Sequence, residues 1–507
     1  MPPRPALLRC ALVALVVALG LTGCVSPKHQ ASSPSAGSSS TPGDAALAPY
    51  YDQVLEWTTC GSEQCAEATV PLDWSDPGGG TVTLALRRIP ASGGSPVGSL
   101  LVNPGGPGRS AIDSISYFRQ VVSRDVLAAY DLVAFDPRGV QHSSPVTCVD
   151  PAELDEMAAW VPDWSTDAGM AEAIERNGDF GRACLERTGD LLGHVDTPSA
   201  ARDMDVLRAV LGDEALSYLG FSYGTELGAT YAALFPERVG RLVLDGALDP
   251  TLDSGEVAAG QAAGFESALR AYVTDCQAGA ACPLGGDADA GLAQIAQLFE
   301  RTRANPLPTG TDRELTSSLA FSGVAAALYA QTSWPLLTQA LTKAIDAADG
   351  SVLLQLADSY YGRSPDGTYA SNQNEAFSAI LCLDDRPSAE PDDMRADAAE
   401  VTAVAPTVGH FFSYGGASCA QWPVPAVGSL ESYEAPGAAP IVVIGTTNDP
   451  ATPYAWAQSL AKLLSSAVLL TFEGEGHTAY GRSNQCIKDA VDTYLLTGEA
   501  PADGTTC

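Results

Sequence analysis

A serine, an aspartate and a histidine occur in this sequence in the order and surroundings that nucleophilic hydrolysis requires. Ser222 lies in Gly220-Phe-Ser-Tyr-Gly224, after the apolar run 216–219 and before a helical pattern that continues to residue 235. A serine at such a strand–turn–helix junction exposes its hydroxyl at a helix N-terminus. The flanking glycines let strand and helix approach closely. We therefore predict that Ser222 is the nucleophile.

A serine hydroxyl is a weak nucleophile at neutral pH until a neighbouring base accepts its proton, and a third group must orient that base. Of the five histidines, His477 follows directly after the last predicted strand. Loops at the carboxyl ends of parallel strands are where sheet proteins assemble active sites. Asp449 follows the preceding strand and gives the order Ser, Asp, His of an α/β-hydrolase. Asp245 also follows a strand and is the alternative acid.

A glycine-rich loop upstream offers a place for the negative charge that develops during acyl transfer. Such an oxyanion is stabilised by preorganised N–H donors. We predict one donor to be the backbone N–H of Tyr223, the residue after the nucleophile. We predict the other in Asn103-Pro-Gly-Gly-Pro-Gly108, where Gly106 presents its amide without an obstructing side chain. The alternative is that this loop is a purely structural turn.

Short apolar runs, each followed by a loop or a helical pattern, predict the elements that position these residues. Such runs occupy residues 98–102, 130–135, 216–219, 239–244, 440–444 and 467–472. They are typical of a mostly parallel sheet with helices on both faces, which is the layout of an α/β-hydrolase. The sequence also predicts a strand at 82–89 after a turn at 76–80, and helices at 198–211 and 454–464.

The stretch 251–432 differs in texture from the rest of the chain. It contains Ala-rich helical patterns at 257–274, 291–303 and 335–348, with irregular joins and no alternation of strand and helix. We interpret it as a mainly helical cap inserted into the sheet topology. The hydrolase core is then discontinuous, with a first part at 46–250 and a second part at 433–507.

The first residues have the pattern of a targeting segment. Arg4 and Arg9 accompany the apolar run 11–21, which has signal-peptide length and is short for a membrane span. Leu21-Thr-Gly-Cys24 is similar to a bacterial lipobox, which implies a signal peptide at 1–23 and lipidation of Cys24. Residues 24–45 then form a lipidated Ser/Pro/Gly tether. An ordinary signal peptide with an incidental cysteine is the alternative.

Charge and cysteine content limit the partners and the compartment. The net charge of −34, with 27 Lys and Arg, argues against nucleic acid and against adsorption to anionic lipid headgroups. Membrane contact is therefore expected only through the N-terminal lipid. With Cys10 and Cys24 set aside, ten of the twelve cysteines remain, an even number suited to an oxidising compartment. Pairing along the sequence predicts Cys60–Cys65, Cys148–Cys184, Cys276–Cys282, Cys382–Cys419 and Cys486–Cys507.

Metal and cofactor chemistry is not expected. The sequence has no Cys-x-x-Cys pair, and its five histidines are scattered. We therefore predict no metal site and no cofactor, and a reaction that uses side chains and water alone.

Six motifs together resemble the secreted actinobacterial tripeptidyl aminopeptidases, α/β-hydrolase serine exopeptidases related to prolyl iminopeptidase. The motifs are Asn103-Pro-Gly-Gly-Pro-Gly108, Asp136-Pro-Arg-Gly139, Gly220-Phe-Ser-Tyr-Gly224-Thr, Val243-Leu-Asp-Gly246, Asp449-Pro-Ala-Thr-Pro453 and Gly476-His477. The likeness runs from about residue 57 to residue 507. It implies cleavage of short peptides from a free N-terminus, with Ser222, Asp449 and His477 as triad and with Gly106 and Tyr223 as oxyanion donors.

The same resemblance implies a group that binds the substrate's ammonium. The family's Cys-x-Asp element is matched by Cys382-Leu-Asp384, so Asp384 is the candidate and Glu226 the lesser one. Solvated surface carboxylates are the competing interpretation in so acidic a chain. The chain departs from residues common in the family at Arg109, Ala111, Gln141 and Glu226. These departures affect the expected peptide length and side-chain preference.

The leading hypothesis is an extracytoplasmic serine exopeptidase, lipid-anchored to the outer face of the bacterial cell membrane. It releases short peptides, with tripeptides as the expected product, and its partner is a peptide with a free N-terminus. One alternative is a carboxylesterase or lipase-like hydrolase with the same triad. Another is a catalytically inactive binding lipoprotein. Hydrolases with an aspartate nucleophile are disfavoured because position 222 is a serine.

Overall fold

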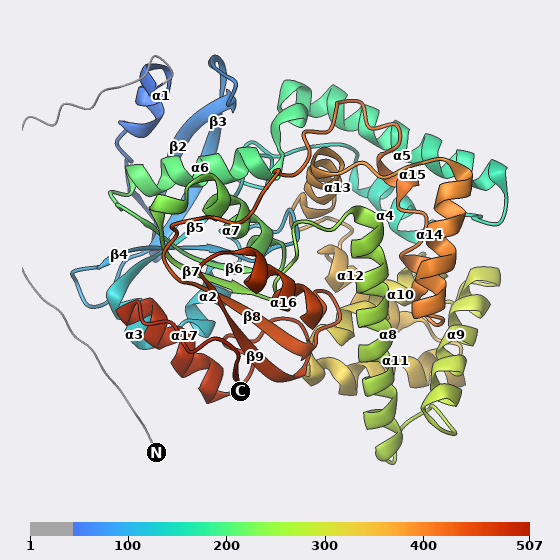
Figure 1. Ribbon diagram of the computed structural model, residues 1–507. Helices are drawn as coiled ribbons and strands as arrows, with labels where there is room; N and C mark the ends of the chain where they lie inside the picture. Colours follow the sequence, from blue (N-terminus) through green and yellow to red (C-terminus); the bar gives the residue numbers. More distant parts are fainter. Residues whose placement is uncertain (1–43) are drawn as a thin grey trace, which may run out of the picture. The chain divides into compact units, whose positions relative to one another are not determined.

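A ten-stranded sheet with the order β1-β2-β3-β5-β4-β6-β7-β8-β9-β10 lies at the centre of the fold (Figure 1). The computed structural model describes residues 44–507, so the predicted signal peptide, Cys24 and nearly all of the tether lie outside the described residues. From β5 to β10 in this order the strands are parallel, while β1, β2 and β3 form an antiparallel edge. The arrangement is an α/β-hydrolase fold.

The strands follow the predicted apolar runs closely in the parallel part of the sheet. Their bounds are β1 Thr58–Cys60, β2 Glu63–Asp73, β3 Asp76–Ile89, β4 Gly98–Asn103, β5 Tyr130–Phe135, β6 Leu216–Phe221, β7 Val239–Asp245, β8 Ile441–Asn448, β9 Ala467–Glu475 and β10 Thr505–Thr506. The predicted turn at 76–80 is wrong, because these residues already belong to β3 and Asp76 pairs with Asp73 of β2.

Alternate residues of each central strand face opposite sides of the sheet, as strand geometry requires. In β4, Leu101 packs against the cluster that contains α6, α7 and α16, while Leu100 and Val102 pack against the cluster that contains α2, α3 and α17. Figure 1 shows α6 and α7 over one face and α3 and α17 over the other. Both faces are therefore buried, which explains why these strands are continuously apolar.

The helices fall into two groups, those that cover the sheet and those that are remote from it. Their bounds are α1 Asp44–Tyr51, α2 Ile115–Val121, α3 Arg124–Ala129, α4 Pro151–Ala159, α5 Asp167–Thr188, α6 Thr197–Val210, α7 Tyr223–Leu234, α8 Ser254–Ala278, α9 Ala288–Ala304, α10 Ser317–Leu328, α11 Trp334–Asp346, α12 Ser351–Tyr361, α13 Gln373–Asp384, α14 Pro391–Val404, α15 Gly416–Cys419, α16 Tyr454–Leu463 and α17 Gln485–Thr497.

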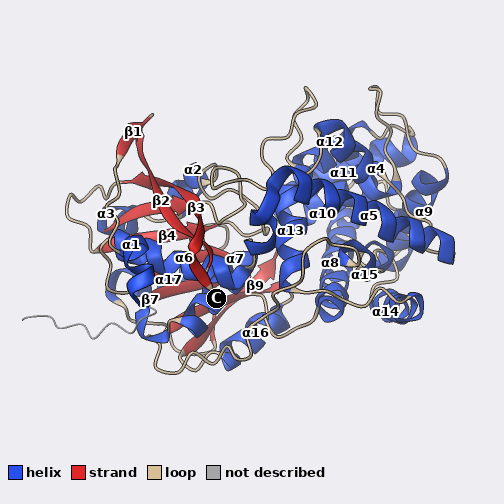
Figure 2. Cartoon of the chain, turned by 90° about the horizontal axis from the view of Figure 1, so that it is seen from above, coloured by secondary structure: helices blue, strands red, loops and turns tan. Residues whose placement is uncertain are grey.

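Between β7 and β8 the chain leaves the sheet and forms α8 to α15 (Figure 2). Helices α8 to α12 and α14 pack around a second apolar core, whereas α13 and Cys419 of α15 belong to the apolar cluster that covers the sheet. Helices α4 and α5 belong to the earlier part of the chain but also pack against this group. Met170 of α5, for example, shares an apolar cluster with Met394 of α14 and Ala417 of α15. We call α8 to α15, together with α4 and α5, the helical layer. It therefore combines the stretch 251–432 with two helices that precede β6 in the sequence.

Five disulfides cross-link the described chain. They join Cys60 to Cys65, Cys148 to Cys184, Cys276 to Cys282, Cys382 to Cys419 and Cys486 to Cys507, which are the pairs expected from the sequence. Disulfides in this number are typical of exported proteins, so the chain is extracytoplasmic. Within residues 44–507, no helix combines the length and the apolar character needed to cross a bilayer.

Candidate active site

Ser222 lies in the tight turn that joins β6 to α7. Its backbone has φ 56° and ψ −126°, a conformation that a non-glycine residue adopts only under constraint. The turn is also crowded, since a Cβ on Gly220 would lie 2.3 Å from the carbonyl oxygen of Gly224. The Ser222 N–H donates to the Asp245 carbonyl at 3.0 Å, which ties the turn to the end of β7. This geometry is that of a nucleophile elbow.

His477 and Asp449 are in direct contact at the ends of β9 and β8. The imidazole Nδ1 lies 2.9 Å from both carboxylate oxygens of Asp449, and 3.2 Å from the hydroxyl of Thr452. Backbone N–H groups of Ala451, Thr452 and Thr478 also donate to Asp449, which fixes its orientation. Both side chains are almost fully buried. A carboxylate so placed holds the imidazole with Nε2 available as a base.

The other imidazole nitrogen, Nε2 of His477, is buried and has no hydrogen-bond partner in the described part of the chain. It lies at the same end of the sheet as Ser222. A Cβ added to Gly246 would be 3.0 Å from Cε1 of His477, while the preceding carbonyl, of Asp245, binds the Ser222 N–H. The end of β7 thus contacts both the candidate nucleophile and the candidate base.

Asp245, the alternative acid, binds backbone instead of the imidazole. Its carboxylate accepts the N–H groups of Ala479 at 2.9 Å and Tyr480 at 2.7 Å. Burial raises the pKa of Asp245 to about 6, and these two hydrogen bonds counteract part of that rise. Asp245 therefore holds the loop that carries His477, and Asp449 is the carboxylate in contact with the imidazole.

The glycine-rich loop at 103–108 lies directly on the Ser222 turn. A Cβ on Gly105 would be 2.8 Å from the Ser222 Cβ and 3.1 Å from the Tyr223 nitrogen, and the φ of Gly105 is +87°, so this contact requires glycine. Asn103 shapes the loop, because its side-chain oxygen accepts the Gly105 N–H at 2.8 Å. Within residues 44–507, neither the Gly106 N–H nor the Tyr223 N–H donates to a backbone carbonyl. Both are candidates to receive an oxyanion.

Two carboxylates lie on the Tyr223 side of the elbow. Asp384, at the end of α13, accepts the Thr197 N–H at 2.8 Å and the Thr197 hydroxyl at 2.5 Å, and that hydroxyl also lies 2.5 Å from the Tyr223 hydroxyl. Burial, and then the charge of Glu226, raise the pKa of the Asp384 carboxyl well above its usual value. Burial raises the pKa of Glu226 to about 7. Neither carboxylate has a Lys or Arg partner among the described residues.

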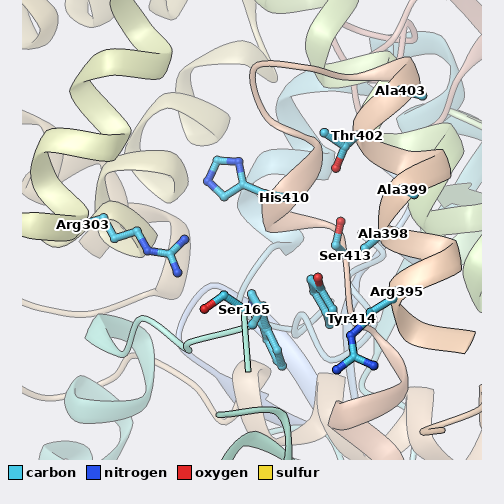
Figure 3. A pocket seen from close by; sticks show the side chains of 11 residues that line it. Ser165, Arg303, Arg395, Ala398, Ala399, Thr402, Ala403, His410, Ser413 and Tyr414 are labelled. Atoms are coloured by element: carbon cyan, nitrogen blue, oxygen red, sulfur yellow. The ribbon is translucent and has the colours of Figure 1, made fainter. Parts of the chain in front are cut away.

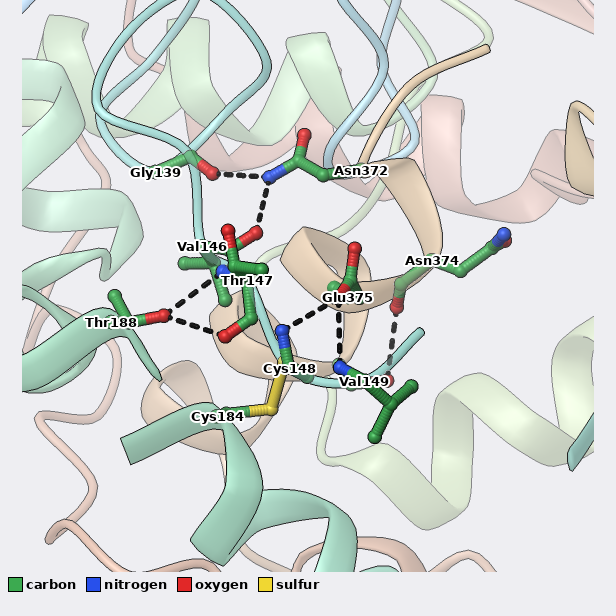
Figure 4. Close-up of a disulfide and its surroundings, with 11 residues drawn as sticks. Gly139, Val146, Thr147, Cys148, Val149, Cys184, Thr188, Asn372, Asn374 and Glu375 are labelled. Atoms are coloured by element: carbon green, nitrogen blue, oxygen red, sulfur yellow. Dashed lines mark hydrogen bonds between the residues drawn. A yellow bond between two sulfur atoms is a disulfide. The ribbon is translucent and has the colours of Figure 1, made fainter. Parts of the chain in front are cut away.

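Helix α13, which carries Asp384, is fixed to the loop that follows β5 (Figure 4). Asn372 donates to the carbonyls of Gly139 and Val146 at 2.9 Å each, and Glu375 accepts the Cys148 N–H at 2.6 Å. The Cys148–Cys184 disulfide lies beside these contacts. A Cβ on Gly108 would meet the Gln373 carbonyl at 2.7 Å, so α13 also touches the glycine-rich loop.

Relatives of known name match the chain over most of its length. Serine protease Hip1 of Mycobacterium tuberculosis is 38% identical, over 90% of this chain and 92% of its own length. Tripeptidyl aminopeptidase of Streptomyces lividans is 33% identical, over 89% of this chain and 86% of its own. Carboxylesterase B of Mycobacterium tuberculosis is 38% identical, over 99% of this chain and 98% of its own length. A family model described as TAP-like protein matches residues 405–507.

The chain belongs to the tripeptidyl aminopeptidase family. It is therefore a serine hydrolase with an α/β-hydrolase fold. The glycine-rich loop, the elbow and the contact between Asp449 and His477 are the parts of the fold on which hydrolysis in such proteins depends.

A separate cavity of about 720 Å³ lies in the helical layer (Figure 3). It is lined by Trp164, Ser165, Arg303, Arg395, Ala398, Ala399, Thr402, Ala403, His410, Ser413 and Tyr414. The hydroxyl of Ser165 binds Asp163, and that of Ser413 binds the Gly409 carbonyl. Among residues 44–507, no hydrogen bond joins the His410 ring to any hydroxyl that lines this cavity, those of Thr402 and Tyr414 included, so the cavity is not the candidate active site.

Sequence reasoning missed the contribution of Tyr329. Its carbonyl accepts the His477 N–H at 2.9 Å, and its ring lies edge-on to the imidazole with centroids 5.3 Å apart. Tyr329 follows α10, in the stretch predicted to be a helical cap, and no motif distinguishes it there. A catalytic base shielded from water implies that some side chain covers it. This expectation does not tell which residue of the sequence does so.

Proposed function

We propose that the protein is a lipid-anchored serine exopeptidase that releases short peptides, tripeptides in particular, from free N-termini. In this proposal Ser222 attacks the scissile carbonyl while His477 accepts its proton and Asp449 orients the imidazole. The N–H groups of Gly106 and Tyr223 stabilise the oxyanion. His477 then protonates the leaving amine, and water, activated by the same base, releases the peptide from the acyl-enzyme.

The observation that carries the exopeptidase assignment is the pair of carboxylates, Asp384 and Glu226, beside the elbow. Both acids are half-buried without a basic partner: burial favours the protonated form of each, and the charge of Glu226 further favours the protonated form of Asp384. A substrate ammonium between them supplies the missing positive charge and favours the carboxylate forms. The preference for a free N-terminus is thus the expected consequence of the pair.

Product analysis tests this assignment. The protein is given tetrapeptides and hexapeptides with free and with acetylated N-termini, and the fragments are identified by mass spectrometry. We expect tripeptide release from free N-termini and a rate lower by about 10²-fold for acetylated peptides, since an acetylated N-terminus lacks the positive charge that the two carboxylates bind. Asp384→Asn should reduce this preference, whereas Asp397→Asn, an exposed acid on α14, is the matched control. Equal rates for both N-termini would contradict the assignment.

A second candidate function is ester hydrolysis with the same triad, which the likeness to a protein named Carboxylesterase B favours. Short-chain esters and peptides are compared at equal concentration. Ester turnover without any tripeptide release would support this candidate over the exopeptidase.

The lipid anchor is the remaining part of the proposal and depends on Cys24. We expect the native chain to incorporate a labelled fatty acid and to remain with the membrane fraction. Cys24→Ala should abolish the label and release the protein. Incorporation that persists in this variant would contradict anchoring through Cys24.

A further inference from the structure

Two arginines lie beside the candidate catalytic groups without an acidic partner. Arg109 follows the glycine-rich loop and Arg482 follows His477 by five positions, and both are exposed. Within residues 44–507, no carboxylate oxygen lies within 4.0 Å of either guanidinium. Other arginines in the described part of the chain also lack an acidic partner, so it is the position of these two, beside Gly106 and His477, that points to a ligand.

The side chain of Arg109 extends from the loop that holds the candidate oxyanion donor. Its backbone N–H donates to the Gly105 carbonyl at 3.3 Å. A Cβ on Gly106 would lie 3.5 Å from Cγ of Arg109, so the arginine stem passes next to Gly106. Its charge reaches the ring of Tyr117, where partial burial raises the pKa and the charges of Arg482 and Arg109 counteract the rise.

Arg482 shares a hydrogen-bond acceptor with the candidate base. Its guanidinium donates to the Tyr329 carbonyl at 2.6 Å, and the same carbonyl accepts the His477 N–H at 2.9 Å. A further donor of Arg482 lies 3.4 Å from the hydroxyl of Thr478. These contacts use two of the five guanidinium donors and leave the others for a ligand.

Charged groups of opposite sign lie near the two sequence neighbours of Ser222. Tyr223, the residue after Ser222, is linked through the Thr197 hydroxyl to Asp384 of the acidic pair. Phe221, the residue before Ser222, packs against Phe118 at 5.3 Å and Tyr117 at 6.4 Å between ring centroids, and the charges of Arg482 and Arg109 act on the pKa of Tyr117. Because His477 has to protonate the leaving amine, the part of the substrate after the cleaved bond lies next to His477, and Arg482 shares the Tyr329 carbonyl with the His477 backbone N–H.

We propose that Arg109 and Arg482 bind a carboxylate directly after the cleaved bond, so that short peptides with a C-terminal carboxylate or an acidic residue there are the preferred substrates. This inference rests on the proposed exopeptidase function. The acidic pair then binds the ammonium end of the peptide and the arginines bind its acidic end. Together they favour short zwitterionic peptides over long neutral ones.

The test uses tetrapeptides Ala-Ala-Ala-Xaa with a free N-terminus. The first arm compares Xaa = Ala as free acid and as C-terminal amide, and the second compares Asp, Ala and Lys as Xaa, all as amides, so that a chain-end carboxylate is separated from a side-chain carboxylate. For an exposed charge pair we expect kcat/KM to favour the carboxylate in at least one arm by about fivefold, with a preference that shrinks as salt rises.

The ratio between matched substrates is the readout, because it is insensitive to the amount of folded enzyme. In Arg109→Gln with Arg482→Gln the ratio should fall to about one, and the corresponding Lys variants should retain part of it. Arg119→Gln on α2 should leave the ratio unchanged, because Arg119 is exposed and also lacks an acidic partner among the described residues. If the Gln variants do not fold, two other results test the subsite. The Lys variants should keep part of the carboxylate preference, and the preference of the unmodified enzyme should shrink as salt rises; failure of both would overturn the subsite.

The outcomes separate the two proposals. Absence of tripeptide release from every peptide, amides included, contradicts the exopeptidase function itself. Tripeptide release with no carboxylate preference in either arm, or with a preference that survives in the double Gln variant, overturns the arginine subsite and leaves the exopeptidase function intact.

Discussion

Glu226→Gln should stabilise the protein at alkaline pH and leave its stability unchanged at acid pH. Glu226 is half-buried on α7, accepts no hydrogen bond in the described part of the chain, and has a pKa raised by burial from 4.5 to about 7. Between these two values the folded protein binds more protons than the unfolded chain. The free energy of unfolding therefore falls as pH rises through this window.

The size of the effect follows from the same values. Each pKa unit corresponds to about 1.36 kcal/mol, so a rise from 4.5 to about 7 costs about 3 kcal/mol at a pH above both. Because part of the side chain reaches solvent, about 1–3 kcal/mol is the expected range. Glutamine has a similar shape and no charge, so it removes this cost at high pH. Below pH 4.5 the glutamate is protonated in both the folded and the unfolded state, so the substitution leaves the free energy of unfolding unchanged there.

Thermal unfolding at pH 4 and at pH 8.5 measures the difference. We expect the variant to melt a few degrees above the unmodified protein at pH 8.5 and at the same temperature at pH 4. Glu237→Gln, an exposed glutamate just after α7, is the control and should change neither value. An equal gain at both pH values, or a loss at pH 8.5, would refute the view that Glu226 is held in an unfavourable charged state.

Three further substitutions test the rest of the site. Asp449→Asn should lower kcat for peptides by about 10³–10⁴-fold with an unchanged melting temperature, because the imidazole loses its orienting carboxylate; an effect below tenfold would speak against this role. Gly105→Ala places a Cβ 2.5 Å from the Phe221 carbonyl and should lower peptide turnover by about 10²-fold, whereas Gly94→Ala, at a similar φ but with no atom within 4 Å, should not. Asn372→Ala removes the hydrogen bonds to Gly139 and Val146 and should lower the free energy of unfolding by about 2–3 kcal/mol in denaturant titrations; an unchanged midpoint would mean that α13 is held by other contacts.

The parallel half of the sheet could be predicted because its strands are buried on both faces. Continuous apolar runs at β4 to β9 are visible in the sequence without reference to their neighbours. The antiparallel edge formed by β1, β2 and β3 is less visible in the sequence, because its strands are not continuously apolar. In β2, buried and exposed residues alternate and Pro71 lies near its end, so the strand is recognisable only once it is paired with β3.

Contacts between distant residues mark the limit of prediction at the site. The order Ser222, Asp449, His477 is a local property of three strand ends, and the structure brings the last two into contact. The hydrogen bond of Tyr329 to His477 joins positions 148 residues apart, and that of Asp245 to Ala479 joins positions 234 apart. Such pairings follow from helix packing and loop closure, which no local pattern encodes. The same holds for α4 and α5, whose apolar faces gave no indication that their partners lie after β7.

Covalent labelling with a fluorophosphonate, followed by peptide mapping, tests the central claim most directly. The reagent reacts with a serine that a neighbouring base activates. We predict a single adduct on Ser222, absent in Ser222→Ala and formed far more slowly in His477→Gln. An adduct on another serine, or labelling at an undiminished rate in His477→Gln, would contradict a catalytic centre built on Ser222 and His477.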